Sequence, residues 1–442
     1  MTEANPLSLG QLSVWHDIRD LRPERRHEPN NAAVWALPPG TCAEAVSAAV
    51  HALALHHPSL RTRYDLQDPD EPRQLPPDKD VRAPVDLVDL TDPGGDGGQR
   101  PAEIALALAA RPFDLGREHG WRARLLARDG APSHLVFVKH HIVADAWAQE
   151  QLHQELLREI TAPGRLGPPP PGPADLAADQ HSPAGRRRQR AALAHWEHVL
   201  AAAPPTALPR DAEAPGAVAQ GTLRSARARA AARTIAAREG ISLAGVVLAA
   251  FAGAVARRCD AGGTGTGDSH DNRLMVQLMS ANRFTARWRD VVTSMNQWVP
   301  ALIEDTGSAF ADLARAAHWS GLAAFRHGMH DVRAVAALRG RLPRAPEPAC
   351  AFNFVAVPPG AAGTAPDTAD TALDGACTGP EREATVVWEE PFTTIGPRCY
   401  ARALEDEHTL SVRLTARDLR RETCAALLWD LHDALLTAAG RA

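Results

Sequence analysis

Residues 135–147 read LVFVKHHIVADAW, an apolar run that ends at two adjacent histidines, with an aspartate four residues after the second. Leu135–Lys139 has the length and composition of a buried strand. Trp147–Ile160 is predicted to be a helix, because apolar residues recur on one face at Leu152, Leu156 and Ile160. The segment therefore predicts a strand that ends at the histidines, a turn, and a helix that begins close to Asp145.

The histidine pair suggests proton transfer. Imidazole is the side chain whose ordinary pKa lies nearest neutrality, so a histidine at a strand end can accept a proton from an attacking amine. His140 and His141 are not expected to bind one metal ion, because adjacent strand residues point to opposite faces. Asp145 also fits a simpler role as the N-cap of the following helix. These residues alone leave a catalytic and a structural interpretation open.

The rest of the chain mixes helical and strand patterns. Thr41 and Glu44 have the spacing of a capping box that opens a helix ending before Pro58. Near the C-terminus, alternation at residues 410–414 predicts a half-buried strand, followed by a helix from about Thr415 to Gly440. The proline-rich stretch 163–173 is the strongest linker. The prediction is an α/β (α+β) protein with two lobes, residues 1–170 and 171–442.

Composition limits the functional classes. The 442 residues are 45% hydrophobic and 23% charged, with a formal net charge of -5, so nucleic acid is not an expected partner. The N-terminus lacks the pattern of a signal peptide, and no apolar run approaches the roughly 20 residues that span a bilayer. Residues 241–255 are expected to form a buried helix. We expect a cytoplasmic protein that does not bind membranes. The six scattered cysteines predict neither disulfides nor a metal site.

Three ordered motifs add a family resemblance. HHIVADA (140–146) resembles the HHxxxDG motif of condensation domains from nonribosomal peptide synthetases, which belong to the chloramphenicol-acetyltransferase-like superfamily. LSLGQLSVW (7–15) resembles the opening SxAQxRxW motif of that family, and HHPSLRTRY (56–64) resembles RHExLRTxF. Residues 280–300 resemble a later motif through Arg283 and Asn296. The resemblance is dense in the first 150 residues and weaker beyond them.

The resemblance implies an architecture and a set of site residues. It implies two chloramphenicol-acetyltransferase-like lobes arranged as a V-shaped pseudo-dimer, with a tunnel between them and the HHxxxD motif in the first lobe. His141 would point into the tunnel as the catalytic residue. Four further motif residues would be structural: His140, Asp145, Ala146 and Arg283. Asp145 would pair with Arg283, tying the first lobe to the second, and Trp147 and Asn296 are candidates for the tunnel wall.

The implied function is that of a free-standing condensation enzyme. A thioester on the phosphopantetheine arm of an acyl or peptidyl carrier protein would be attacked by an amine or alcohol, which is either a small molecule or carrier-bound. The product would be an amide or ester. The enzyme itself would bind no cofactor directly, since the carrier protein supplies the phosphopantetheine, and no GxSxG elbow indicates a covalent intermediate.

Departures from the motifs keep alternatives open. The final motif glycine is Ala146, the arginine of the opening motif is Ser13, and the VNT-like segment reads MNQ. The rivals are an acyltransferase that uses free acyl-coenzyme A, an epimerisation-type relative, and a catalytically silent relative that recruits a partner. Heterocyclisation is disfavoured, because histidines stand where that subfamily carries aspartate. Trp15, Trp147 and Trp196 are expected in the core rather than as stacking platforms.

Overall fold

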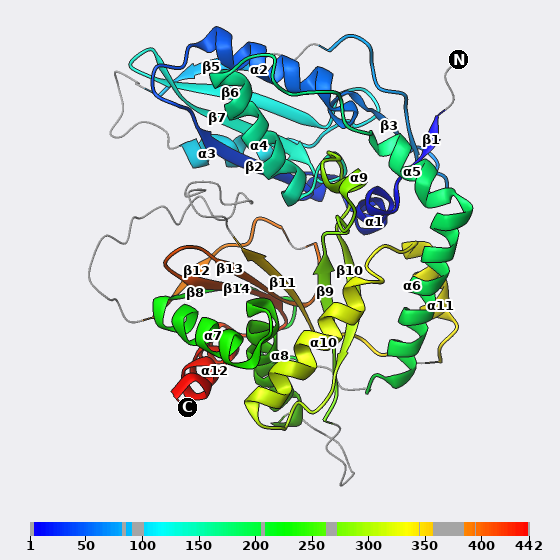
Figure 1. The fold of residues 1–442 in the computed structure, drawn as a ribbon, viewed down its shortest axis with the longest axis vertical. Coiled ribbons are helices and arrows are strands. Elements are labelled where there is room, and N and C mark those ends of the chain that lie inside the picture. Colours follow the sequence, from blue (N-terminus) through cyan, green and yellow to red (C-terminus); the bar gives the residue numbers. More distant parts are fainter. Residues whose placement is uncertain are drawn as a thin grey trace. The chain divides into compact units, whose positions relative to one another are not determined.

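The computed structural model describes most of the chain, namely residues 4–81, 85–90, 101–204, 208–261, 272–343, 345–356, 384–393 and 395–440. Contacts divide these residues into two compact units. The first unit contains the described residues up to Arg187 together with Ala281–Asn296, and the second contains the others. Figure 1 labels the elements of both units.

The first unit is built on a four-stranded sheet in the order β2-β7-β6-β5. Its strands are β2 (Asn30–Ala36), β5 (Val85–Asp89), β6 (Trp121–Arg128) and β7 (Ala131–His140). β7 pairs antiparallel with both β2 and β6, and β5 pairs parallel with β6. The predicted buried strand is confirmed, because β7 is buried from Leu135 to its end at His140.

Helices cover this sheet, and short elements complete the unit. The helices are α1 (Leu9–Ile18), α2 (Ala43–His56), α3 (Pro101–Ala109), α4 (Ala146–Thr161), α5 (Pro173–His181) and α9 (Ala286–Arg289), with the 3-10 turns η1 (Pro23–Arg25) and η2 (Pro58–Arg61). A small sheet joins β1 (Asn5–Pro6), β4 (Arg73–Gln74) and β3 (Tyr64–Asp65). α2 packs on α4, while α3 contacts β2 and β7. The predicted helix after the histidines is therefore α4.

Strand alternation assigns the two faces of the four-stranded sheet. The Trp35 ring of β2 stacks on His153 of α4 with 5.0 Å between ring centroids. Asn30, on the same strand, donates its side-chain amide to the Ala109 carbonyl at the end of α3, at 2.8 Å. Because positions 30 and 35 differ by an odd number, they lie on opposite faces. His140 pairs with Asn30 in the strand register and so faces the α3 side.

The second unit holds a seven-stranded mixed sheet in the order β10-β9-β11-β13-β14-β8-β12. Its strands are β8 (Val218–Ser225), β9 (Leu274–Ser280), β10 (Gln297–Ile303), β11 (Cys350–Ala356), β12 (Thr385–Glu389), β13 (Cys399–Glu405) and β14 (Leu410–Arg417). Its helices are α6 (Pro183–Ala202), which begins in the first unit, α7 (Ala226–Glu239), α8 (Leu243–Ala261), α10 (Phe310–Phe325), α11 (Val332–Gly340) and α12 (Arg421–Gly440). α8 is buried from Gly245 to Ala256, which confirms the predicted buried helix.

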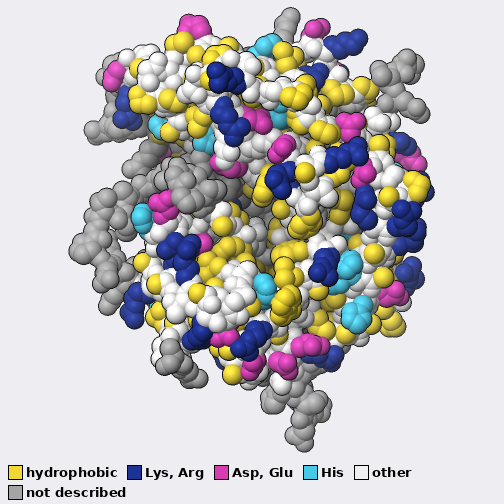
Figure 2. Space-filling model, viewed as in Figure 1, with side chains coloured by type: hydrophobic (Ala, Val, Ile, Leu, Met, Phe, Trp, Pro, Cys, Tyr) yellow, Lys and Arg dark blue, Asp and Glu magenta, His cyan; other side chains and the backbone are white. Residues whose placement is uncertain are grey.

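In the described part of the chain, no single helix combines the length and apolarity needed to cross a membrane. α7 and residues 243–259 together have the length and composition of a membrane-spanning segment, but the two helices are bent by 111° relative to each other. On the face shown in Figure 2, basic and acidic side chains are interspersed with apolar ones.

The division of the chain differs from the predicted boundary at residue 170. α5 follows that point but belongs to the first unit. Its Gln180 side chain accepts a hydrogen bond from the Leu9 amide at 2.8 Å, and the Pro173 carbonyl accepts one from Gln74 at 3.3 Å. Since α5 is held by α1 and β4 of the first unit, the proline-rich linker does not separate the units.

Three local predictions were wrong. The capping box at Thr41 is absent: Cys42 is the N-cap of α2 without a side-chain hydrogen bond, and the Thr41 hydroxyl donates to the Pro38 carbonyl at 2.7 Å. The last helix begins at Arg421 rather than near Thr415, because Thr415 remains in β14 opposite Gln220 of β8. Trp147 is 49% exposed and is not a core residue, whereas Trp196 is buried as expected.

Gly10 of α1 packs closely against residues 294–295 of the same unit, and a substitution can test this contact. A methyl group at this position would lie 2.2 Å from the Ser294 carbonyl oxygen and 2.7 Å from the Met295 Cα. We expect Gly10→Ala to lower the free energy of unfolding by about 1–3 kcal/mol, because backbone atoms must move. The measurement is urea denaturation, with Gly340→Ala as the control, since no atom lies within 4 Å of a methyl group there. Equal stability of the two variants would contradict the close packing of α1 on residues 294–295.

Candidate active site

The turn after β7 is held on both sides. The His141 amide donates to the Pro29 carbonyl at 2.8 Å, which continues the strand ladder by one residue. The Val143 amide then donates to the His140 carbonyl at 3.0 Å, closing the turn. Ser59 of η2, inside the HHPSLRTRY motif, donates its hydroxyl to the Val143 carbonyl at 2.7 Å. The backbone around His141 is thus fixed by two neighbouring segments.

His140 is a buried, neutral histidine. It is 3% exposed, and burial, together with the neighbouring His141 and Lys139, lowers its pKa to about 3. Its Nδ1 accepts a hydrogen bond from the Ile142 amide at 3.1 Å, and its ring meets Phe113 edge to face. An imidazole with this pKa does not gain a proton near neutrality, so His140 fits the structural role predicted for it.

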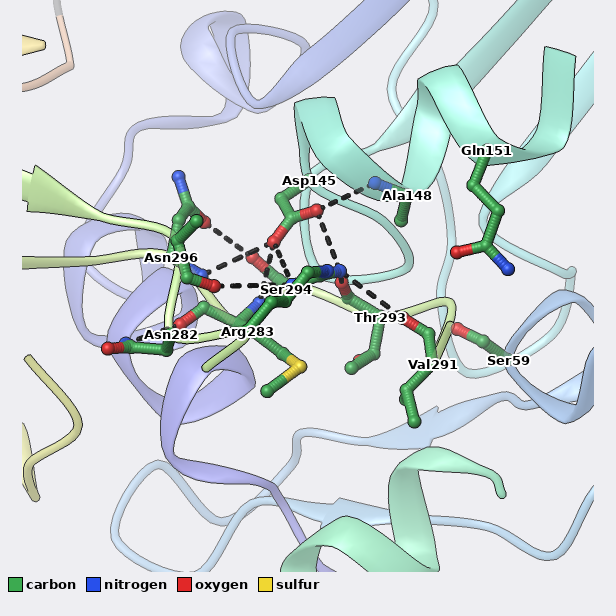
Figure 3. A network of polar contacts seen from close by, with 12 residues as sticks. Ser59, Asp145, Ala148, Gln151, Asn282, Arg283, Val291, Thr293, Ser294 and Asn296 are labelled. Atoms are coloured by element: carbon green, nitrogen blue, oxygen red, sulfur yellow. Dashed lines mark hydrogen bonds and ion pairs between the residues drawn. The ribbon is translucent and has the colours of Figure 1, made fainter. Parts of the chain in front are cut away.

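Asp145 is the most heavily hydrogen-bonded carboxylate in the turn (Figure 3). Its Oδ1 accepts from the Ala148 amide at 3.0 Å, the N-cap bond of α4, and from Arg283 Nη2 at 3.0 Å. Its Oδ2 accepts from Arg283 Nη1 at 3.0 Å and from the amides of Met295 at 3.0 Å and Asn296 at 3.3 Å. Both oxygens are committed to donors, so the carboxylate is suited to holding structure rather than to moving protons.

Arg283 gathers the segment 281–296 around this carboxylate. The side chains of Asp145 and Arg283 are only 2% and 1% exposed. Arg283 Nη2 also donates to the carbonyls of Val291 and Thr293, both at 3.2 Å. The preceding residue, Asn282, adopts a left-handed φ of 56°, a conformation that asparagine tolerates. The predicted ion pair is present, but it lies within the first unit, because residues 281–296 belong there. The expectation that it ties two lobes together is corrected.

His141 lies beside Ser294, a residue that the sequence patterns did not single out. The distance from Ser294 Oγ to His141 Nδ1 is 3.2 Å. The Ser294 hydroxyl donates to Asn296 Oδ1 at 3.1 Å, a contact drawn in Figure 3. When the single hydroxyl hydrogen of Ser294 is used in the bond to Asn296 Oδ1, Nδ1 of His141 is the donor to Oγ. The neutral imidazole then carries its proton on Nδ1 and its lone pair on Nε2.

The motifs that are separate in sequence meet at this turn. Gly10 of the first motif approaches Ser294, and Gln11 donates to the Tyr64 hydroxyl at 3.2 Å. His57 contacts Glu155 of α4 at 2.5 Å. The motif order in the sequence was the one signal that could have indicated this meeting. Ser59 and Ser294 were missed because an isolated serine carries no pattern of its own.

The remaining predicted site residues have definite places. Ala146, where the motif has glycine, is the first residue of α4 and adopts a helical conformation, so the methyl group needs no unusual backbone. Trp147 is exposed, and Asn296 binds Ser294 and Asp145. Their assignment to a tunnel wall stays a prediction. Among the residues that the structure describes, no group of three or more His, Cys, Asp or Glu could hold a metal ion.

Comparison with known sequences identifies relatives. The family model described as "Condensation domain" matches residues 17–273, more than half of the chain. Nonribosomal peptide synthetase kk1B of Curvularia clavata is 30% identical over 180 residues, which are 39% of this chain and 1% of that protein. Beauvericin nonribosomal cyclodepsipeptide synthetase of Beauveria bassiana is 31% identical over 180 residues, 39% of this chain and 6% of that protein. The chain thus spans only a small part of the curated relatives that it matches.

Solved structures share the fold across the whole chain. A structure from the enacyloxin polyketide synthase, described as the basis of condensation domain-mediated chain release, is 23% identical with a TM-score of 0.75, covering 100% of this chain and 83% of that one. The condensation domain of the Monacolin K polyketide synthase MokA is 16% identical with a TM-score of 0.76, and the match covers 99% of this chain and 98% of that one. An epimerization domain of tyrocidine synthetase B is 16% identical with a TM-score of 0.73, and the match covers 99% of this chain and 98% of that one. At these identities the similarity establishes the fold.

Loss of the Asp145 carboxylate should reveal its structural role. We expect Asp145→Ala to lower the free energy of unfolding by about 3–5 kcal/mol, because it leaves the buried Arg283 guanidinium without its counter-charge. Asp331→Ala is the matched control, since Asp331 is also a helix N-cap but forms its ion pair at the surface. Loss of a cap alone costs about 0.5–2 kcal/mol. If urea denaturation gives the same loss for both variants, the buried pair contributes nothing beyond the cap.

Proposed function

Because this chain belongs to the condensation-domain family, we propose that it catalyses acyl transfer from a carrier-bound thioester to an amine or alcohol, forming an amide or ester. The observation that carries the proposal is the pairing of His141 Nδ1 with Ser294 Oγ, beside a carboxylate saturated by five donors. A histidine held in one tautomer presents a defined basic atom, Nε2. General bases of this kind typically contribute about 10²–10⁴ in rate.

The proposed steps use one proton acceptor. The acceptor's nitrogen or oxygen attacks the thioester carbonyl while its proton passes to His141 Nε2. The tetrahedral intermediate then collapses, the carbon–sulfur bond breaks, and the departing pantetheine thiolate takes the proton from the imidazolium. No acyl group is attached to the protein at any point. Asp145 stays bound to Arg283 throughout, so its part is to hold the turn.

The donor and its carrier are proposed from the family. Condensation domains act on phosphopantetheine thioesters of carrier proteins and use no cofactor of their own. A carrier protein with an acyl or aminoacyl thioester is therefore the proposed partner, and the acceptor is a small molecule or a second carrier-bound group. We also propose that the protein works in the cytoplasm, where carrier proteins are loaded.

Two rival functions are compatible with the fold. An epimerisation-type activity would abstract a proton from the Cα of a carrier-bound residue, and the fold is compatible with it, since an epimerization domain is among the similar structures. A partner-recruiting role without catalysis is the second rival, and partner binding is compatible with the fold, because an X-domain in complex with OxyB gives a TM-score of 0.68. The ordered contact of His141 with Ser294 favours a catalytic protein over a silent one.

Donor choice is tested with a panel of acyl and aminoacyl thioesters, each presented on a peptidyl carrier protein and on coenzyme A. Pooled amino acids, amines and alcohols serve as acceptors, and products are identified by mass spectrometry. We expect an amide or ester from carrier thioesters at a rate at least about tenfold above that from coenzyme A. Equal rates would support an acyl-coenzyme A transferase. Cα deuterium exchange without a new product would support the epimerisation-type activity.

The role of His141 is tested with His141→Ala on the donor and acceptor pair that turns over in this panel. Product formation should fall at least about 10²-fold, because the base is lost. The melting temperature should stay close to that of the wild type, since the ring is only partly buried. A variant that keeps more than about a tenth of the wild-type rate would contradict the general-base assignment.

A further inference from the structure

A chain of four polar groups links the HHPSLRTRY motif to the segment that carries Ser294. His57 is fully buried, and its Nε2 lies 2.5 Å from Oε2 of Glu155 on α4. Gln151, one turn earlier on α4, donates its side-chain amide to Glu155 Oε1 at 3.1 Å. The same nitrogen donates to the Asp290 carbonyl oxygen at 2.9 Å. The chain therefore ends on the backbone of residues 281–296.

The orientation of the Gln151 carboxamide is dictated by its partners. Both Glu155 Oε1 and the Asp290 carbonyl are acceptors, so both hydrogens of the Gln151 nitrogen are used. The opposite atom, Gln151 Oε1, is buried and has no hydrogen-bond partner. Leaving a buried acceptor unsatisfied is costly. The two hydrogen bonds of the Gln151 nitrogen therefore keep the amide in this orientation even though its oxygen has no partner. Figure 3 shows Gln151 on α4, to one side of the Asp145 network.

Glu155 is held as an anion at the centre of this chain. Burial opposes its ionisation, but the hydrogen bonds from His57 and Gln151 and the nearby His56 and His57 rings together lower the pKa of the carboxyl. An ionised Glu155 is the better acceptor for the Gln151 amide. The glutamate thus fixes the side chain that in turn holds Asp290.

The Asp290 contact supplies an anchor that the Asp145 network lacks. Arg283 secures the start of the segment through Asp145 and also binds the carbonyls of Val291 and Thr293, while Met295 secures its end. Asp290 lies between Arg283 and Met295, four residues before Ser294, and it is exposed. The Gln151 bond attaches this outer part to α4, the helix that Asp145 caps. Ser294 is therefore approached by restraints from both directions along the backbone.

We propose that Gln151 and Glu155 are positioning residues for His141, acting through Asp290 and Ser294 to hold the imidazole in its Nδ1-protonated form. The inference rests on the proposed function, since it concerns the efficiency of the same base. Neither residue touches the reacting atoms. Their effect should therefore appear in the turnover number rather than in the binding of the thioester.

The experiment compares Gln151→Leu with Gln154→Leu. Gln154 is the matched control, because it lies on the same helix and makes a similar bond to Glu150 four residues earlier, but on an exposed face. Hydrogen–deuterium exchange needs no substrate: in Gln151→Leu the amides of residues 290–296 should exchange at least about fivefold faster, and in the control they should not change. Glu155→Leu should behave like Gln151→Leu, whereas Glu155→Gln, which keeps an acceptor for Gln151, should recover most of the protection.

Kinetics on the donor and acceptor pair found in the panel complete the test. Gln151→Leu should lower kcat about tenfold with KM for the thioester changed less than twofold, as expected for a base displaced by a fraction of an ångström. In the Ser294→Ala background the same substitution should have little further effect, because both act on one imidazole. Full additivity of the two substitutions, or unchanged exchange, would overturn the positioning role. The proposed function fails separately, if His141→Ala retains activity.

Discussion

The ion pair between Asp145 and Arg283 is the interaction on which the candidate site depends. A carboxylate and a guanidinium, both almost fully buried, are stabilised together because each makes further hydrogen bonds. Asp145 accepts hydrogen bonds from the helix amide of Ala148 and from two amides of residues 295–296, while Arg283 donates to three carbonyls of its own segment. The pair therefore joins the end of β7, the start of α4 and the segment 281–296 into one rigid assembly.

This assembly explains why the partner of His141 comes from so far along the chain. β9 and β10 pair antiparallel, with Gln297 opposite Ser280, and both belong to the second unit. The connection between them leaves that unit and packs in the first, where Ser294 contacts His141. Because the connection is held at Arg283, Asp290 and Met295, the serine is presented to the imidazole in a defined place.

The local elements followed from sequence where the pattern was long and apolar. β7 and α4 were predicted because an apolar run and a helical stripe are properties of neighbouring residues. The predictions that failed depended on distant partners. Thr415 stays in a strand because β8 lies beside it, and α5 joins the first unit because Leu9 and Gln74 bind it. The Thr41 capping box is the exception, because it fails through a local contact: the hydroxyl bonds to the Pro38 carbonyl three residues earlier.

The sequence by itself determined the family resemblance, the candidate base His141 and the pairing of Asp145 with Arg283, because these are carried by residue types at set positions in motifs. It also predicted that His140 and His141 face opposite ways, since strand alternation is local. Only the tertiary structure decided which unit holds Arg283, that His141 Nδ1 lies beside Ser294, and that Gln151 and Glu155 of α4 are linked to the segment that carries Ser294. Those features are contacts between residues up to about 150 positions apart, and single serines, glutamines and glutamates leave no local pattern from which such contacts could be read.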